Sequence, residues 1–216
     1  MIIEWFGHSC FLLKSNSGTA VLIDPFDPTV GYEQPHVACD CLLMTHKHFD
    51  HSAENTVIGE TCKIDSPGQY EIGGVQISGF ESFHDNESGM LRGKNTIYKI
   101  IIDGVAVCHL GDLGHIPSPQ LYEKLGKVDV LMIPVGGNVT IDAAQALEII
   151  NALSPNIILP MHYLTDKVTN ISVAPVSNFI ELANVHYDVS RTGRNTISVE
   201  KNELKKRTRI YILEYN

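Results

Sequence analysis

The sequence of 216 residues contains no apolar run that approaches the length of a membrane-spanning helix. Residues 1–5 lack the charged and then apolar layout of a signal peptide, so we expect neither a membrane span nor an export signal. Cysteine is also scarce: an odd count of five at scattered spacings favours free thiols in a reducing, cytoplasmic compartment. Cys39 and Cys41 have no second cysteine pair with which to complete a zinc knot.

Positively charged residues are also few. Lys and Arg number 16 against 25 Asp and Glu, and the net charge of -9 argues against broad affinity for nucleic acid or anionic membrane. Two catalytic motifs are missing as well: the glycine-rich turn at 134–138 lacks the spacing of a P-loop, and no G-x-S-x-G serine elbow occurs. With 44% hydrophobic and 19% charged residues the chain is typical of globular proteins, and we expect residues 1–216 to form a single domain.

The strongest positive signal is a cluster of histidines at residues 46–51. Three imidazoles and one carboxylate occur within this short stretch, directly after the apolar run 41–44, which predicts a buried strand. His46 and His48 are two residues apart, so an extended backbone points both rings the same way. Two neutral imidazoles side by side suit a borderline cation such as zinc, and the pattern therefore predicts a metal site.

Further ligands must come from elsewhere in the chain. Asp50 and His51 can serve a second ion close to the first, and a catalytic zinc ion typically keeps three protein ligands. The downstream candidates, most of which end or closely follow an expected strand, are His84, His109, Asp112, His115, His162 and His186. Zn2+ is the first expectation for the metal, with Mn2+, Ni2+ or Fe2+ as alternatives, because all of them accept imidazole and carboxylate.

The order of these candidates resembles the metallo-β-lactamase superfamily of binuclear metallo-hydrolases. Flanking segments are more narrowly similar to its small bacterial and archaeal branch that includes L-ascorbate-6-phosphate lactonase: Trp5-x-Gly7-His8-Ser9-Cys10, Leu22-Ile23-Asp24-Pro25-Phe26, Gly111-Asp112 and Pro160-Met161-His162-Tyr163. The resemblance covers most of the chain and implies an α/β fold, a four-layer αββα sandwich in which two mixed β-sheets are flanked by helices.

The resemblance also implies ligands for two divalent ions. The expected ligands are His46, His48 and His84 for the first ion, and Asp50, His51 and His162 for the second. Asp112 would bridge both ions, and Asp24 would orient the metal loop without binding metal. His109 competes with His84 for the third place in the first site, and the family order favours His84.

A metal-dependent hydrolase is the function that this resemblance implies. A hydroxide that bridges the two ions would attack a small-molecule ester or lactone, phosphorylated ones included. The alternative within enzymes is a phosphodiesterase for nucleotides or lipids, and the alternative of another class is a non-catalytic metal-binding or sensing module. A di-iron oxidoreductase is disfavoured because His48 stands where that branch has glutamate. We expect a small-molecule substrate and no nucleic-acid partner, and a homo-oligomer stays open.

Three residues are expected to take part in the chemistry: Asp50, Asp112 and His8. Asp50 could orient the attacking water, whereas His8 is either catalytic or a structural histidine that bonds the first loop. Arg92 and Lys94 lie in a loop on the metal side. There they either clamp a phosphate or carboxylate of the substrate or form an exposed basic turn.

His115 and Tyr163 complete the candidates for substrate binding. His115 closely follows the bridging ligand, where it could also cap the next helix, and Tyr163 lies beside His162, where it could donate a proton or simply pack. A basic run at 201–209, which includes Lys205 and Lys206, is explained by a solvated hairpin tip.

Apolar segments and turn residues predict the secondary structure. Strands are expected at 2–6, 10–14, 19–23, 40–44, 75–83, 95–102, 105–109, 128–133, 156–159 and 185–189, with a final hairpin of 196–200 and 209–215. Helices are expected at 52–58, from the N-cap Ser118 to about Leu125, at 141–153 with Thr140 as the cap, and at 173–183.

Overall fold

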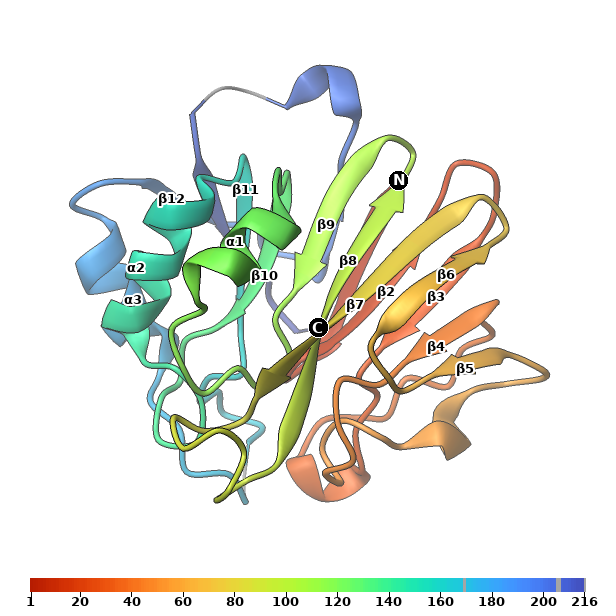
Figure 1. Ribbon diagram of the computed structural model, residues 1–216, viewed down its shortest axis with the longest axis horizontal. Helices are drawn as coiled ribbons and strands as arrows, with labels where there is room; N and C mark the ends of the chain where they lie inside the picture. Colours follow the sequence, from red (N-terminus) through yellow and green to blue (C-terminus); the bar gives the residue numbers. More distant parts are fainter. Residues whose placement is uncertain (169, 205–206, 216) are drawn as a thin grey trace.

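The computed structural model describes residues 1–168, 170–204 and 207–215, in which two β-sheets pack face to face (Figure 1). The strands are β1 (Ile2–Gly7), β2 (Cys10–Lys14), β3 (Ala20–Ile23), β4 (Cys41–Leu43), β5 (Cys62–Ile64), β6 (Gly68–Ile72), β7 (Val75–Phe83), β8 (Lys94–Ile102), β9 (Val105–His109), β10 (Val130–Pro134), β11 (Ile157–Met161), β12 (Asp188–Arg191), β13 (Thr196–Ser198) and β14 (Arg209–Ile212). Lys205 and Lys206 of the expected basic tip lie outside the described residues.

Both sheets are mixed, as the sequence predicts. The first has the order β13-β1-β2-β3-β4-β5, with antiparallel pairing as far as β3 and parallel pairing beyond it. The second has the order β12-β14-β11-β10-β9-β8-β7-β6, antiparallel from β6 to β9 and parallel from β9 onward. Together with their helices these sheets form the α/β sandwich that the sequence predicts.

Strand β2 is apolar throughout most of its length because both faces of the first sheet are covered. Phe11 and Leu13 belong to the large core cluster between the sheets, whereas Cys10 and Leu12 belong to a second cluster on the outer face. Phe26, from the loop after β3, is part of that outer cluster. Since side chains alternate along a strand, a slip of one residue would exchange the two cores, and the register is therefore strongly specified.

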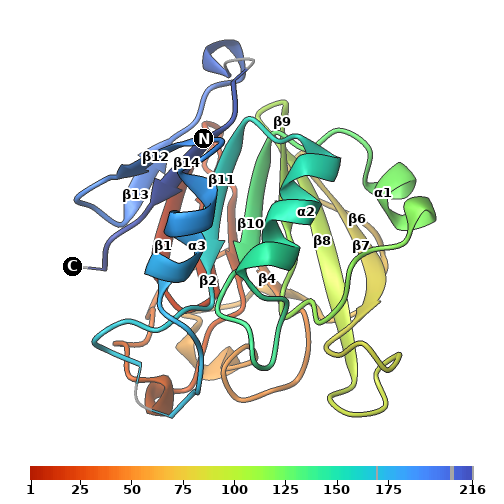
Figure 2. The same ribbon diagram turned by 90° about the vertical axis from the view of Figure 1, so that its left-hand side faces the viewer.

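The three α-helices of the described residues are α1 (Pro119–Leu125), α2 (Ala143–Leu153) and α3 (Val176–Ala183). α2 and α3 lie over the outer face of the second sheet, in front of β10 and β11 (Figure 2). α1 begins as predicted, because the Ser118 side chain accepts a hydrogen bond from the Leu121 N–H and proline occupies the first turn. Over the first sheet the cover consists of loops and short 3-10 turns, η1 (Pro28–Val30) and η2 (Glu54–Thr56).

The predicted start of the second helix is wrong. Asp142, and not Thr140, is the N-cap of α2. Its carboxylate accepts from the Gln145 N–H (2.9 Å) while the Gln145 side chain accepts from the Asp142 N–H (3.0 Å), which makes a complete capping box. Ile141 is not helical because its N–H donates to the Leu113 carbonyl (2.8 Å). α3 likewise starts at Val176, after Pro175, and not at 173.

The predicted final hairpin is also wrong. β13 pairs with β1 at the edge of the first sheet, whereas β14 lies between β11 and β12 in the second sheet and runs parallel to both. Two strands were missed, β5 and β6, because they are short edge strands with largely exposed, polar side chains. The C-terminal segment therefore connects the open edges of the two sheets.

Three smaller expectations also fail. The segment 52–58 contains only the 3-10 turn η2, and the strand expected at 185–189 is β12, which starts after an exposed turn that includes His186. The strand expected at 156–159 is β11, which runs on to Met161 and includes Pro160 opposite Ile133. This is tolerated because the pairing of β11 with β14 covers Ile157 and Ile158 and ends before the proline.

The segments that follow β1, β4, β7, β9 and β11 gather at one end of the sandwich, the lower end in Figure 1. The expected metal ligands belong to these segments, so strands of both sheets deliver them to one place. Within the described part of the chain, every helix is too short or too polar to span a membrane.

Candidate metal centre

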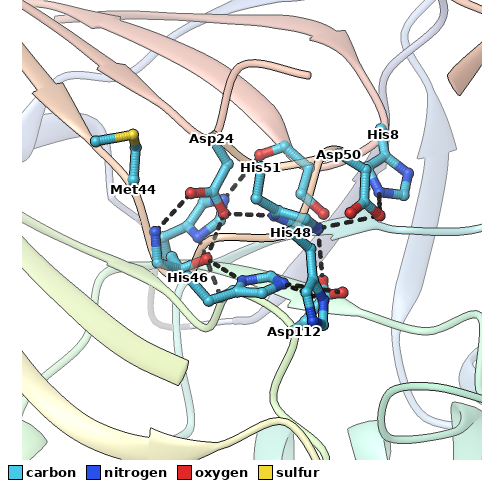
Figure 3. Close-up of polar contacts among 12 residues, drawn as sticks. His8, Asp24, Met44, His46, His48, Asp50, His51 and Asp112 are labelled. Atoms are coloured by element: carbon cyan, nitrogen blue, oxygen red, sulfur yellow. Dashed lines mark hydrogen bonds and ion pairs between the residues drawn. The ribbon is translucent and has the colours of Figure 1, made fainter. Parts of the chain in front are cut away.

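The structure brings all seven expected ligands together. One group, His46, His48 and His84, offers ring nitrogens that all lie within 4.8 Å of one another. A second group with the same spacing consists of His8, Asp50, His51 and His162, and a third consists of His46, His51 and Asp112. The first two groups correspond to the two predicted metal sites, with His8 added to the second, and Figure 3 shows most of these side chains converging.

Asp112 lies between the two groups. Its Oδ2 is 3.2 Å from Nε2 of His84 and 3.1 Å from Nε2 of His162, while its Oδ1 is 3.1 Å from Nε2 of His51. One carboxylate therefore contacts residues of both predicted sites, as a bridging ligand would. Asp112 is itself fixed by Asn95, whose Oδ1 accepts from the Asp112 N–H (3.0 Å).

Asn95 is a residue that the sequence analysis missed. It is buried near the start of β8, and its Nδ2 donates to Ser82 Oγ (2.7 Å) and to the Leu110 carbonyl (2.9 Å). With its Oδ1 on Asp112, the amide ties two strands of the second sheet to the loop of the bridging carboxylate. A lone polar residue at the head of an apolar strand gives no spacing signal, so only the fold could reveal this role.

Hydrogen bonds fix which nitrogen of each ring is free. Asp24 Oδ2 accepts from Thr45 Oγ1 (2.7 Å) and from His51 Nδ1 (2.8 Å). Because the single Thr45 hydroxyl proton is used on Asp24, Thr45 Oγ1 must accept from His46 Nδ1 (3.0 Å). The Nδ1 atoms of both rings are thus used in hydrogen bonds, and the Nε2 atoms of His46 and His51 face the centre.

Among the residues that the structure describes, several buried atoms at the centre make no hydrogen bond, namely Nε2 of His51, Nε2 of His162 and Oδ1 of Asp112. His51 Nε2 lies only 3.1 Å from a carboxylate oxygen of Asp112, a place where either a proton on Nε2 or a metal ion would balance the negative charge. Imidazole nitrogens and carboxylate oxygens are ligands that Zn2+, Mn2+, Ni2+ and Fe2+ accept. The residues present therefore fit divalent metal ions.

The charges at the centre also favour a bound cation. Burial lowers the pKa of His46 to about 3, so this ring is neutral and able to bind metal. Burial alone would also lower the pKa of His51, but the carboxylates of Asp112, Asp50 and Asp24 outweigh it and hold that pKa well above its usual value. The same concentration of negative charge would stabilise a bound cation.

The carboxylates are ionised. Burial alone would raise the pKa of Asp112, but His162 and His51 outweigh it and hold the value well below its usual range. Burial opposes ionisation at Asp50 too, yet the charge of His51 and the hydrogen bond from His8 keep its pKa lowered. Two charged carboxylates amid imidazole nitrogens form a site that matches the ligand chemistry of divalent transition metals.

His109, the alternative to His84 as a metal ligand, uses both of its ring nitrogens in other hydrogen bonds. Its Nε2 donates to the Ser9 carbonyl (2.9 Å) and its Nδ1 accepts from the Gly111 N–H (3.1 Å), so neither nitrogen is left for a metal. Through its hydrogen bond to Ser9, the His109 ring holds the loop after β1 against the end of β9. His84 instead faces Asp112, with its Nε2 lying 3.2 Å from Asp112 Oδ2.

Residues 2–162 match the family model described as a β-lactamase superfamily domain. The chain belongs to the metallo-β-lactamase superfamily. It is similar to a UPF0173 protein of Pyrococcus furiosus, with 32% identity over 76% of this chain and 84% of the relative. A UPF0173 metal-dependent hydrolase of Thermoplasma volcanium shares 28% identity over 77% of this chain and 85% of the relative.

Solved structures agree with this membership. A candidate Zn-dependent hydrolase of the metallo-β-lactamase superfamily from Thermotoga maritima superposes with a TM-score of 0.81 at 36% identity, and the match covers 99% of this chain and 98% of the other. Igni18, a metallo-hydrolase from Ignicoccus hospitalis, superposes with a TM-score of 0.68 at 21% identity, which shows the shared fold alone. This chain is accordingly a metal-dependent hydrolase of the metallo-β-lactamase superfamily.

His8 enters the centre of this superfamily member from the first sheet. Its Nε2 lies 3.1 Å from Asp50 Oδ2, its ring is 4.2 Å from that of His162, and it adopts a left-handed backbone conformation at φ 50°. Burial lowers the pKa of His8 to about 4, so the ring is neutral and Nε2–H donates to Asp50. The sequence left His8 as either catalytic or structural, and the structure brings it into contact with Asp50.

A cavity of about 510 Å³ opens beside the first site. Its lining includes His46, His48, Arg92 and Lys94, so both predicted basic residues lie next to the expected metal ligands. Lys94 is paired with Glu81 (2.6 Å). Arg92 has no ion pair within the described residues. Missed by the sequence analysis but present in the lining are Lys47, Asp65, Ser66 and Asn95.

The other two predicted substrate residues lie elsewhere. His115 accepts from the Phe83 N–H (3.3 Å) through Nε2 and donates to the Ile116 carbonyl (2.9 Å) through Nδ1, so both nitrogens serve the loop. Tyr163 is buried and packs on Trp5 with ring centroids 5.8 Å apart. Neither residue lines the cavity beside His46.

Proposed function

We propose that this chain is a binuclear metallo-hydrolase of small-molecule esters or lactones, phosphorylated ones included. The observation that supports it most strongly is the position of Asp112, whose two carboxylate oxygens contact histidines of both ligand groups. One carboxylate placed between two sets of ligands is the arrangement that two neighbouring ions require. The assignment of His46, His48 and His84 to one ion, and of Asp50, His51 and His162 to the other, is part of this proposal.

When bound, two divalent ions supply a hydroxide nucleophile at neutral pH and polarise the carbonyl or phosphoryl oxygen that is attacked. The chain's own residues place and orient the reactants. Asp50 is proposed to orient the attacking water, and His8 holds Asp50 in place through its Nε2–H. Asn95 and Asp24 keep Asp112 and His51 aligned toward the centre.

The cavity beside the first site suits a small molecule. Its volume of about 510 Å³ is within the usual range for small ligands. Arg92 offers a cation near the expected metal ligands, and an unpaired guanidinium favours a substrate that carries a carboxylate or phosphate. A phosphorylated sugar lactone combines such a group with a reactive carbonyl, which supports the proposed likeness to the lactonase branch.

Three wider features belong to the same proposal. Residues 1–216 would act as one hydrolase domain, since strands from both ends of the chain build the two sheets. A reducing, cytoplasmic setting is supported by the five cysteines, all of which are free thiols. No nucleic-acid partner is expected of a chain with a net charge of -9.

The test is ring opening of a phosphorylated sugar lactone by metal-reconstituted protein, with Asp112→Ala as the paired control. We expect turnover by the wild type and a loss of at least about a thousandfold in the variant, since one carboxylate serves both ions. Turnover that survives in the variant would contradict the proposed site. Turnover of bis(p-nitrophenyl) phosphate but of no lactone would favour the phosphodiesterase, and none on either panel, with metal bound, would favour a sensing module.

A further inference from the structure

The segment between β7 and β8 is a compact loop of ten residues, His84 to Gly93. Its base is closed because the His84 N–H donates to the Gly93 carbonyl (3.1 Å). Inside it, the Gly93 N–H donates to the Gly89 carbonyl (3.0 Å), and the Met90 N–H donates to the Glu87 carbonyl (3.2 Å). The loop thus makes its own hydrogen bonds and resembles a small Ω-loop more than a flexible connection.

One buried carboxylate fills the interior of this loop. The Asp85 side chain accepts four backbone hydrogen bonds, two on each oxygen: Oδ1 from Glu87 (2.8 Å) and Gly89 (2.8 Å), and Oδ2 from Leu91 (3.0 Å) and Arg92 (2.7 Å). In the described part of the chain it has no ion pair with any Lys or Arg. Burial alone would raise the pKa of Asp85, but these four N–H groups outweigh it and keep the carboxylate charged.

The two ends of the loop belong to the site. His84 faces Asp112 (3.2 Å), while Arg92 and Gly93 line the cavity that also includes His48. The whole side of the cavity formed by this loop therefore depends on how the loop is folded. Charge-assisted hydrogen bonds to backbone N–H groups are strong and directional, so the Asp85 carboxylate is suited to holding that fold.

The start of the loop is also fixed from outside. The Gly114 N–H donates to the Phe83 carbonyl (2.9 Å). A Cβ at position 114 would collide with the backbone of His84 and Asp85, so only glycine allows this close approach. Gly114 follows Asp112 by two residues, and the crossing therefore locks the loop against the segment of the bridging carboxylate.

We propose that Asp85 is a positioning residue for substrate binding. Its carboxylate holds residues 86–92 in one conformation and thereby fixes Arg92 and Gly93 as a wall of the cavity, so this loop is a rigid wall and not a lid. The proposal rests on the proposed function to the extent that the substrate occupies this cavity. It assigns Asp85 no contact with the reacting atoms and no metal ligation.

The first test compares Asp85→Asn with Glu87→Gln in metal-loaded protein. Glu87 lies in the same loop and is exposed, and only its backbone is used by Asp85, so the control removes the same charge without removing an acceptor. Asparagine leaves two of the four N–H groups without an acceptor, and amide hydrogen exchange at residues 86–92 should accelerate about tenfold or more. The control should exchange like the wild type. Equal exchange in wild type and Asp85→Asn would overturn the proposal.

A second variant, Asp85→Glu, provides the same test if Asp85→Asn does not fold. Asp85→Glu keeps the charge, but its longer side chain cannot place both oxygens on the same four N–H groups, so it should also accelerate exchange within 86–92. If Asp85→Asn fails to fold, this variant decides the question in the same way. Exchange that is unchanged in a folded Asp85→Glu protein would likewise overturn the proposal.

A kinetic readout separates positioning from mere stability. With a lactone that the wild type hydrolyses, Asp85→Asn should raise KM about tenfold, leave kcat within about threefold, and keep the full complement of bound metal. Wild-type KM despite faster exchange would show that the loop does not position substrate and would overturn the proposal. If the wild type hydrolyses no lactone, the proposed function fails, while the exchange experiment still decides whether Asp85 holds the loop.

Discussion

His51 illustrates how a single hydrogen bond decides which ring nitrogen is free for a metal. Its Nδ1 donates to Asp24 (2.8 Å), which leaves Nε2 aimed at Asp112 (3.1 Å). The sequence predicted that Asp24 orients the metal loop, because Asp24 stands in a recognisable motif, but it did not identify His51 as the partner of Asp24. It could not predict Asn95, since a buried amide has no characteristic spacing. At the scale of residues, the candidate metal-binding side chains could be predicted from the sequence. The residues that hold these side chains in place could be predicted only in part.

The choice between His84 and His109 also belongs to this scale. Both end or follow a strand, so the local pattern cannot separate them. In the fold, both nitrogens of His109 are hydrogen-bonded, whereas Nε2 of His84 faces Asp112 (3.2 Å). We predict that His84→Ala loses one of two bound metal ions, measured by elemental analysis. His109→Ala should keep both ions, and the reverse outcome would exchange the two assignments.

His8 offers a second test at the residue scale. Because it orients Asp50 through one hydrogen bond (3.1 Å), His8→Ala should lower kcat by roughly ten- to a hundredfold while metal content changes little. Turnover and bound metal should be measured on the same preparation. A proportional loss of both would make His8 a metal ligand and would remove the orienting role.

At the scale of elements, the predicted helix start was right for α1 and wrong for α2 and α3. Ser118 caps α1 as predicted, whereas β13 and β14, which look like a hairpin in the sequence, join different sheets. A helix cap is a local interaction between neighbouring residues, so sequence can reveal it. Strand partners such as β1 and β13 lie almost two hundred residues apart, and no local pattern identifies them.

The cap of α2 yields a prediction at this scale. Asp142→Ala removes the acceptor for the Gln145 N–H and should lower the free energy of unfolding by about 1 kcal/mol, without changing metal content. Glu148→Ala, an exposed change on the same helix, should cost less than about 0.5 kcal/mol. Urea denaturation of both variants checks this, and equal effects would mean that the capping box does not stabilise the helix.

At the scale of the whole molecule, the metal centre connects the two sheets. His8, Asp24 and the motif at 46–51 come from the first sheet, whereas His84, Asp112 and His162 come from the second. The fold class could be predicted from the sequence because the ligand order is typical of one superfamily. The way in which the C-terminal strands β12, β13 and β14 join the edges of both sheets could not be predicted from the sequence.

This connection predicts that bound metal stabilises the fold. Metal at about a hundredfold over its dissociation constant should raise Tm by roughly 5–10 °C for a chain of this size. The stripped protein should melt lower and recover on addition of Zn2+ or Mn2+, which differential scanning calorimetry can follow. A Tm that does not respond to metal would mean that the centre contributes nothing to joining the sheets.

The metal-free protein should also lose stability in mild acid. The pKa of His8 is lowered to about 4 and that of His46 to about 3, chiefly by burial, whereas an unfolded histidine titrates near 6.5. Below pH 6.5 the histidines of the unfolded state therefore bind protons, whereas His8 and His46 of the folded state stay neutral. The free energy of unfolding consequently falls as the pH drops toward 4. His8→Gln should flatten this dependence of the urea midpoint, and an unchanged slope would contradict the buried, neutral state of His8.

Whether two ions share Asp112 can be decided by counting the metal bound to each chain. Elemental analysis of wild type and Asp112→Ala, each reconstituted with excess metal and freed of unbound ions, gives the number of divalent ions per chain. We expect two ions in the wild type and fewer in the variant, because each predicted site loses a ligand. One ion in the wild type, or two retained in Asp112→Ala, would contradict it.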